Sequence, residues 1–282
     1  MNNTEQKWTD TIESSSSLFD LKLAEVWRYK DLAYMFVKRD FITFYKQTIL
    51  GPLWFIIQPI LSTIMFYFIF VVIAKTQNKG LDAFLFILSG QVIWSYFADT
   101  LNKVSTVFTA NANIFGKVYF PRLILPISIT LSGLLKFIVQ FGIFVLFLIY
   151  GIITQDNIQP NLWALFFPIL IVLMGMFALG FGMILSSLTT KYKDLIFLFS
   201  FAISLYMYAT PVVMPLQKFG QYKYLIELNP LTGIFECFRY GFFGNGNFNP
   251  IVLIYSIVCI LIIFAIGTLI FNKVEKSFMD TV

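Results

Sequence analysis

The stretch LWFIIQPILSTIMFYFIFVVIA, residues 53–74, contains no charged side chain. At about 1.5 Å of helical rise per residue, about 20 apolar residues match the roughly 30 Å hydrocarbon core of a bilayer. Hydrophobic residues make up 58% of the whole chain and charged residues 12%, against about 45–50% and about 25% in soluble domains. The stretch therefore predicts a transmembrane helix, and the composition predicts an integral membrane protein.

Five further apolar blocks predict an all-α membrane protein with six transmembrane helices. The expected spans are residues 53–74, 84–97, 124–150, 162–188, 195–214 and 251–271. The second block is short and continues into Ala98-Asp99-Thr100-Leu101, so its boundary stays open. With these boundaries no acidic residue lies inside a span, which argues against a carrier driven by protons or sodium through intramembrane carboxylates.

Basic residues indicate the orientation of the six spans. With the N-terminus inside, the inner segments hold fourteen Lys and Arg and the outer segments five, which by the positive-inside rule places both termini in the cytoplasm. The first fifty residues are too polar for a secretory signal peptide. The same rule explains the +5 net charge without a nucleic-acid partner. The expected organisation is a polar tail (1–20), an amphipathic interface helix (21–52), a six-helix domain (53–271) and a cytoplasmic tail (272–282).

The interface helix is predicted from a charged, aromatic-rich approach to the first span. The approach reads WRYKDL at 27–32, KRD at 38–40 and YKQT at 45–48. Such a pattern favours a helix that lies along the cytoplasmic membrane surface, available to a partner and joined to the span that follows. Its candidate residues are Trp27, Tyr29, Arg39, Asp40, Tyr45 and Lys46.

The third span carries a polar stripe at four-residue spacing, formed by Ser128, Ser132, Lys136 and Gln140. Residues four apart share one helix face, and a lysine at the bilayer centre costs roughly 2.5–3.5 kcal/mol on insertion scales. The stripe should therefore face water or another helix. Three interpretations stay open: a translocation path, polar packing between helices or subunits, and a lysine that reaches toward the interface.

Two other spans carry features with competing interpretations. The fifth ends with Ser204, Tyr206 and Tyr208, which suit either an interfacial aromatic belt or a path along which sugar rings stack on aromatic faces. The fourth carries Ala178, Gly182 and Ser186 at the same spacing, and there tight helix packing is the better interpretation.

The segment between spans five and six, residues 215–250, predicts two short helices broken at Asn229-Pro230. They are too short to span and are expected to be re-entrant or interfacial; an ordinary external loop resting on the bilayer is the alternative. The apolar set of the second helix keeps helical spacing, and Glu236, Arg239 and Tyr240 are expected to point away from it.

The sequence lacks the residues that metal binding, histidine-based catalysis and ATP hydrolysis would need. The chain has no histidine, no Cys-x-x-Cys pair and no Gly-x-x-x-x-Gly-Lys-Ser/Thr phosphate loop. The sequence therefore predicts no metal site, no catalytic residue and no cofactor bound by this chain. An energised transporter built on it would draw its energy from another chain.

The segment from Trp27 to Pro59 resembles the permease subunits of bacterial ABC-2 type polysaccharide exporters, which export O-antigen, capsule and teichoic acid. The matching elements there are Trp27 and Tyr29, Arg39-Asp40, YKQT at 45–48, LGPLW at 50–54, and Pro59. Further matches are KVYFPR at 117–122 with Pro126, KYKDL at 191–195, and NPL at 229–231 with Glu236 and Arg239. Lys193 stands where the family often has arginine, which costs bidentate hydrogen bonding.

This resemblance implies a homodimeric permease in the bacterial cytoplasmic membrane, paired with two copies of an ATPase subunit that binds ATP and Mg. The substrate would be a lipid-linked polysaccharide such as O-antigen. The loop around 102–117 would include the helix that docks into the ATPase, with coupling residues Asn113, Phe115, Lys117, Tyr119 and Arg122. Asn229, Pro230, Glu236 and Arg239 would belong to an external gate.

Three rival functions remain open. An ABC-2 permease that exports a small molecule or drug would share the architecture. A membrane-embedded glycosyl- or acyltransferase should group acidic or histidine residues at one membrane face, and Asp156, Glu227 and Glu236 form no obvious constellation. A channel without an ATPase would leave the basic cytoplasmic surface unexplained.

Overall fold

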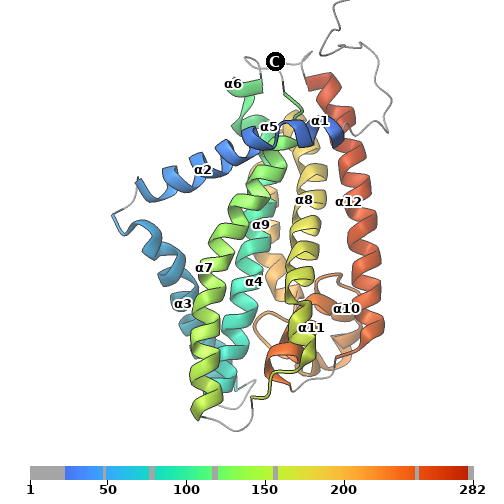
Figure 1. The fold of residues 1–282 in the computed structure, drawn as a ribbon. Coiled ribbons are helices and arrows are strands. Elements are labelled where there is room, and N and C mark those ends of the chain that lie inside the picture. The colour runs from blue at the N-terminus through green and yellow to red at the C-terminus, as the bar shows by residue number, and fades with distance from the viewer. Residues whose placement is uncertain are drawn as a thin grey trace, which may run out of the picture.

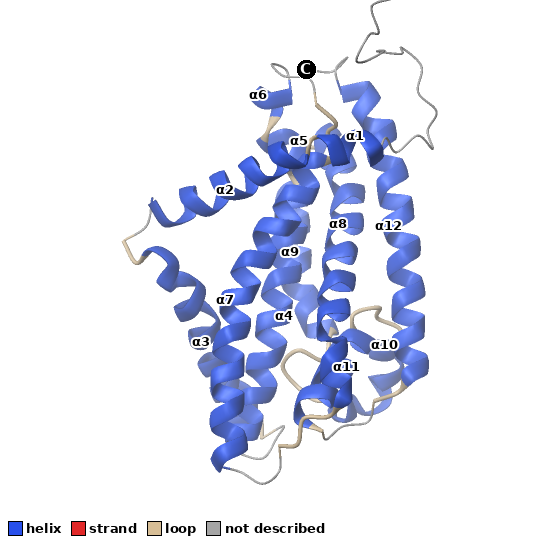
Figure 2. Ribbon diagram, in the orientation of Figure 1, coloured by secondary structure: helices blue, strands red, loops and turns tan. Residues whose placement is uncertain are grey.

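The computed structural model describes residues 23–46, 49–75, 80–115, 120–154, 158–244 and 248–278. These described ranges contain helices and no strand (Figure 2). The α-helices are α1 Leu23–Arg28, α2 Lys30–Lys46, α3 Trp54–Phe66, α4 Leu81–Ser105, α5 Val107–Ala110, α6 Ala112–Phe115, α7 Ile124–Thr154, α8 Phe167–Lys191, α9 Leu195–Tyr206, α10 Lys223–Glu227, α11 Thr232–Phe243 and α12 Pro250–Phe278. Short 3-10 turns cover Gly51–Leu53, Leu162–Phe166, Met207–Ala209 and Leu216–Tyr222, and a π-helix covers Tyr67–Ile73.

Five described segments are long and apolar enough to cross a membrane: Gly51–Ile73, Leu81–Ser105, Ile124–Thr154, Leu162–Lys191 and Pro250–Val274. The fifth expected span, residues 195–214, appears as a shorter apolar helix, Leu195–Ala209. The chain is thus a multi-pass membrane protein of helices, as its composition predicts.

Helices α4, α7, α8 and α12 form a bundle of long, roughly parallel rods, in which α8 packs between α4 and α12 (Figure 1). Glycines allow the closest approaches. A Cβ built on Gly267 of α12 would lie 2.1 Å from the carbonyl oxygen of Gly180 on α8, and one on Gly182 would lie 2.7 Å from Val104 of α4. Tight packing along the fourth span is therefore confirmed, because a side chain at either glycine would push the helices apart.

The N-terminal helices lie across the bundle and turn sharply into α3. Helices α1 and α2 occupy the range expected for the interface helix, and α2 leads away from the bundle before α3 returns (Figure 1). The turn uses Gly51 at φ +51°, a left-handed conformation that glycine adopts without a Cβ clash. Pro59 then sits inside α3, and a π-helix ends the segment, so the first span is irregular along its length.

The second span is longer than the sequence suggested. Helix α4 runs to Ser105 without a break, so Asp99 lies within it. The expectation that no acidic residue lies inside a span is therefore wrong. The polar run after Phe97 lowers the local hydropathy, but Lys136 on α7 forms an ion pair with Asp99, which lets the carboxylate stay on a membrane helix.

The fifth expected span ends earlier than residue 214. Helix α9 ends at Tyr206, a 3-10 turn follows, and Thr210 is extended at φ −129° and ψ 155°. Thr210 precedes Pro211, and a residue before proline is disfavoured in helical geometry. Residues 210–213 then form a buried turn, whose Pro211 and Val212 carbonyls bond to Arg239 of α11.

One end of the bundle carries α1, α5, α6 and the C-terminal end of α12, and the opposite end carries α10 and α11 (Figure 1). At the first end a chain of rings connects five segments. Phe36 of α2 lies 5.9 Å from Phe120, which lies 5.7 Å from Phe115 of α6. Phe115 contacts Phe108 of α5 at 5.7 Å, and Phe108 stacks on Phe271 of α12 at 4.6 Å. This aromatic chain joins α2, α5, α6 and α12 mechanically.

Candidate functional site

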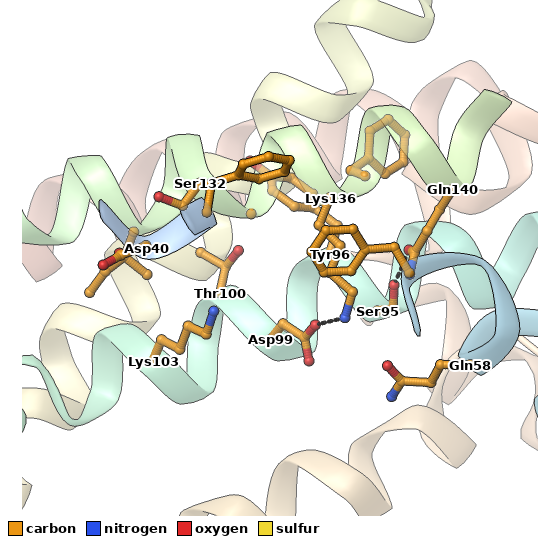
Figure 3. A pocket seen from close by; sticks show the side chains of 15 residues that line it. Asp40, Gln58, Ser95, Tyr96, Asp99, Thr100, Lys103, Ser132, Lys136 and Gln140 are labelled. Carbon is orange, nitrogen blue, oxygen red and sulfur yellow. Dashed lines mark hydrogen bonds and ion pairs between the residues drawn. The ribbon is translucent and has the colours of Figure 1, made fainter. Parts of the chain in front are cut away.

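A polar pocket of about 270 Å³ lies where α2, α3, α4 and α7 meet (Figure 3). Helix α4 contributes five of the residues that line the pocket, and α7 contributes six. The lining consists of Asp40, Phe41, Phe55, Gln58, Ser95, Tyr96, Asp99, Thr100, Lys103, Ile129, Ser132, Gly133, Lys136, Phe137 and Gln140. Of the lining residues on α4 and α7, Ser95, Asp99, Thr100, Lys103, Ser132, Lys136 and Gln140 carry polar side chains, so polar groups of both helices meet here.

An ion pair between Lys136 and Asp99 crosses the pocket from α7 to α4 (Figure 3). The lysine side chain is 16% exposed and the aspartate side chain 40%. The ammonium also lies 5.9 Å from the centre of the Phe55 ring on α3. Removing a lysine from water is costly unless it is paired, and the pair with Asp99 meets that requirement between two membrane helices.

Three buried polar atoms around the same pocket have no hydrogen-bond partner among the described residues. They are Thr100 Oγ1, Ser132 Oγ and Gln140 Nε2. Gln140 Oε1, by contrast, accepts a hydrogen bond from Ser95 Oγ at 2.6 Å. Thr100 and Gln140 are each 1% exposed. Buried groups of this kind are nearly always bonded to protein, water or a ligand, so the pocket has unused capacity for a polar occupant.

The pocket shares two rings with an apolar groove on its other side. Tyr96 and Phe137 line both cavities, and the groove, about 380 Å³ in volume, lies between α4, α7 and α8. Gly133 permits the close contact of α7 with α4, since a Cβ there would lie 2.8 Å from Thr100 Oγ1. The two rings thus separate a polar space from an apolar one.

The structure brings together part of the predicted translocation path. Ser132, Lys136 and Gln140 line the pocket. Ser128, at the same spacing, is buried outside it and donates to the carbonyl of Leu125 at 2.8 Å. Lys136 therefore makes a polar contact between two helices. A translocation path along this stripe through the bilayer stays a prediction.

The residues predicted at the end of the fifth span lie away from the pocket. Ser204 is exposed and donates to the Ser200 carbonyl at 3.0 Å. Tyr206 packs 6.0 Å from Trp94, and its hydroxyl donates to Asn229 Oδ1 at 2.7 Å. Tyr208 is 53% exposed. Tyr206 thus packs inside the bundle. Of these two tyrosines, Tyr208 is the one whose ring is exposed.

At the opposite end of the molecule, Arg239 bonds to several segments at once. Its guanidinium donates to the carbonyls of Pro211, Val212 (2.7 Å) and Phe86 (3.2 Å) and to Ser89 Oγ (3.3 Å). The group also lies 3.5 Å from the centre of the Phe86 ring. At 4% exposure Arg239 is buried, so the polar side of α11, away from its apolar stripe, is covered as well. Helix α11 is enclosed by neighbouring segments, and its polar face bonds to their carbonyls.

Glu236 and Asn229 complete that end. Glu236 Oε1 lies 4.0 Å from Arg239 Nη1, and burial raises the pKa of Glu236 while the nearby guanidinium opposes the rise. Asn229 donates to the Ala209 carbonyl at 2.9 Å, and its Oδ1 accepts from Leu231 N at 3.0 Å. Pro230 follows Asn229 in the break between α10 and α11. Asn229 and Arg239 therefore connect the end of α9 and the turn after it to α11.

The predicted interface residues lie on α1 and α2, except that Tyr29 is in the turn between them. Trp27 is 74% exposed with the Lys30 ammonium 5.8 Å from its ring. Arg39 donates to Asp40 Oδ1 through Nε at 2.9 Å and Nη2 at 2.7 Å. Tyr45 and Lys46 belong to the last turn of α2.

Of the predicted coupling residues, Asn113 is exposed on α6 and Phe115 is buried. Arg122 is 7% exposed, with its guanidinium 5.4 Å from the Phe115 ring centre. Lys117 and Tyr119 lie outside the described residues. The exposed and buried members of this set therefore require different tests.

Sequence reasoning missed the α4 side of the pocket, namely Ser95, Asp99 and Thr100. Their spacing puts Ser95 and Asp99 four residues apart on one face of α4, as Ser132, Lys136 and Gln140 are on α7. The sequence could have indicated the pairing of these helices, because the stripe on α4 carries an acidic residue and the stripe on α7 a basic one. The pairing was missed because Asp99 was placed beyond the end of the span.

The ABC-2 type transporter family model matches residues 32–243. An O-antigen export system permease protein RfbA of Klebsiella pneumoniae is 30% identical over 89% of this chain and 94% of its own length. The protein of the same name from Myxococcus xanthus is 23% identical over 92% of this chain and 98% of its own length. The matched region contains the polar pocket and all of α11. The chain therefore belongs to the ABC-2 type transporter family.

Proposed function

We propose that this chain is the membrane-spanning subunit of an ATP-driven exporter that moves a lipid-linked polysaccharide, of the O-antigen kind, out of the bacterial cytoplasm. The observation that carries the proposal is the likeness, over 94% of the relative's length, to a permease named for O-antigen export. The chain carries no phosphate-loop motif, so ATP and Mg would be bound by a separate ATPase subunit. The chain itself acts as a permease and not as an enzyme.

We infer that the chain crosses the membrane six times with both termini in the cytoplasm. Leu195–Ala209 is about 22 Å long at 1.5 Å per residue, short of the roughly 30 Å core. The buried turn after Thr210 and the α10–α11 pair would fill the remaining outer thickness, where non-helical backbone is tolerated because it is enclosed by protein. The fourteen inner basic residues support this orientation.

Coupling to the ATPase would pass through α5 and α6. These short helices lie at the end of the bundle that also carries α1 (Figure 1), and the aromatic chain from Phe36 to Phe271 connects them to α2 and α12. Movement of α6 would therefore shift the interface helix and the last span together. ATP can drive such a change only if the ATP-bound partner prefers one permease conformation over the other. The resemblance to polysaccharide exporters supports a homodimer with two ATPase copies.

The proposal is tested by purifying the tagged full chain in mild detergent and identifying the chain that accompanies it. We expect a nucleotide-binding subunit in equal amount, vanadate-sensitive ATP hydrolysis, and loss of surface polysaccharide when the permease is deleted. Export of a small molecule with unchanged surface polysaccharide would favour the drug-exporter alternative. A chain that purifies alone and supports no ATP hydrolysis would refute the exporter.

A further inference from the structure

At the floor of the polar pocket between α2, α3, α4 and α7 lie polar atoms that have no hydrogen-bond partner in the described part of the chain. Thr100 Oγ1, Ser132 Oγ and Gln140 Nε2 are buried without a partner in the described part of the chain. The two hydroxyls can each donate and accept, whereas the amide nitrogen donates. An occupant that offers acceptors satisfies all three atoms, and one that also donates can use the lone pairs of the two hydroxyls as well.

The charges of the pocket balance. Lys103 and Lys136 are matched by Asp40 and Asp99, and Lys136 is already paired with Asp99. Asp40 also pairs with Arg39, which does not line the pocket, but a phosphate or carboxylate entering here would still meet two carboxylates that repel it beside the ammonium groups. The balance therefore favours an uncharged polar occupant over an anion.

The remaining lining groups have the character of a sugar site. Phe41, Phe55, Tyr96 and Phe137 provide aromatic surface beside the amides and carboxylates. The apolar C–H faces of a sugar ring carry slight positive charge and pack on the negative face of an aromatic ring. The hydroxyls of the same ring both donate and accept hydrogen bonds, so they can bond to the two buried hydroxyls in either direction and to the amide nitrogen of Gln140.

Access and size limit what enters. Gln58 and Lys103 are exposed at the rim, while Thr100 and Gln140 lie buried at the floor. The volume of about 270 Å³ is at the lower end of small-ligand pockets, which begin at about 300 Å³. It suits one sugar residue and is too small for several.

We propose that this pocket binds one uncharged sugar residue, within a single copy of the chain, through Thr100, Ser132, Gln140 and the Asp99–Lys136 pair. The inference rests on the proposed function, because it names a contact between the exporter and the kind of unit from which its polymer is built. The pocket lies beside α2 and α3, so occupancy is positioned to affect the joint between the interface helix and the first span.

The test is saturation-transfer NMR on the full-length chain in nanodiscs. The probes are methyl α-D-glucopyranoside, methyl α-D-mannopyranoside and methyl α-L-rhamnopyranoside, with inorganic phosphate as the anionic competitor. At least one glycoside should give a saturable signal that phosphate does not displace. Thr100→Val and Ser132→Ala remove the two free hydroxyls with little change of shape, and each should raise the apparent Kd about fivefold.

Ser186→Ala is the matched control, since it deletes a buried serine hydroxyl of helix α8 that does not line the pocket. Its glycoside binding should equal that of the original chain. Both pocket variants lose an unsatisfied polar atom, so their thermal stability should be unchanged or higher, and lost binding would not reflect misfolding.

Three outcomes would overturn the proposal. Absence of a saturable signal from any glycoside would mean that water alone fills the pocket. Displacement by phosphate would identify an anion site, and equal binding by Thr100→Val and the original chain would place the sugar elsewhere. Export measured in cells separates this inference from the proposed function: export without glycoside binding rejects only the pocket, and binding without export rejects only the exporter.

Discussion

Arg239 illustrates how one side chain can organise irregular backbone inside a membrane protein. Residues 210–213 form no helix, and their carbonyls would be unsatisfied in a hydrocarbon environment. The planar guanidinium carries several donors in a fixed geometry, and it bonds to Pro211, Val212 and Phe86 at once. Gly90 makes room for it, because a Cβ there would lie 2.7 Å from Arg239 Nη2.

Arg239→Lys should destabilise the protein despite keeping the charge. An ammonium group cannot reproduce the fork of hydrogen bonds, so buried carbonyls lose partners and the expected loss is about 3–5 kcal/mol. Thermal unfolding of the purified chain in detergent measures the effect. Lys218→Gln, at an exposed position nearby, is the control and should unfold like the original chain. If Arg239→Lys unfolded at the same temperature as the original chain, the hydrogen bonds of the guanidinium would not be needed for stability.

The Asp99–Lys136 pair should show strong coupling in a double-mutant cycle. Asp99→Asn or Lys136→Gln alone leaves one charge on a membrane helix without its partner, and we expect each to cost about 1–3 kcal/mol. The double variant should recover part of that loss, because neither charge remains. Unfolding in detergent gives the four stabilities. Additive losses would show that the two charges act independently.

At the scale of elements, the contact between α8 and α12 depends on two glycines facing each other. Gly267→Ala would put a methyl group 2.1 Å from the Gly180 carbonyl oxygen, and relief requires the helices to separate. The expected destabilisation is about 1–3 kcal/mol. Thermal unfolding checks it, with Gly142→Ala as the matched control, since a Cβ there meets nothing within 4 Å. Equal behaviour of the two variants would refute the close crossing.

Helix α6 offers a test of coupling that does not disturb the core. Asn113 is exposed, so Asn113→Arg should leave folding unchanged while altering any surface that docks the ATPase. We expect normal insertion of the permease with reduced co-purification of the ATPase and reduced export. Arg122 is unsuitable for this purpose because it is buried against Phe115, and its reversal would damage folding as well. Unchanged export in Asn113→Arg would remove α6 from the docking surface.

For the whole molecule, the orientation can be measured by labelling single cysteines. In a chain whose Cys237 and Cys259 are replaced by alanine, Lys218→Cys should react in intact cells with a maleimide that does not cross membranes. Asn113→Cys should react only after the inner membrane is opened. Both positions are exposed, so access alone decides the result. Labelling of Asn113→Cys in intact cells would reverse the proposed topology.

Much of this fold was predictable because each long helix is apolar on its own. The spans beginning at residues 53, 124, 162 and 251 follow from local hydropathy. Local hydropathy does not predict features of one segment that depend on another: Asp99 remains on α4 through Lys136 on α7, and Arg239 is buried against carbonyls of α4 and of the turn after α9. Half of the pocket was found from the α7 stripe, and the other half required knowing which helix faces it.

The bonds of Arg239 also have a consequence for how the protein is made. Its carbonyl partners lie 27 and 28 residues earlier, at Val212 and Pro211, and 153 residues earlier, at Phe86. Helix α11 therefore emerges from the ribosome with a guanidinium whose carbonyl partners all lie in other segments. We expect the translocon to retain this segment until α4 and the end of α9 are in place. Assembly of the outer end would then be a late step of biogenesis, and a chain truncated before Arg239 would expose the unpaired turn to quality-control proteases.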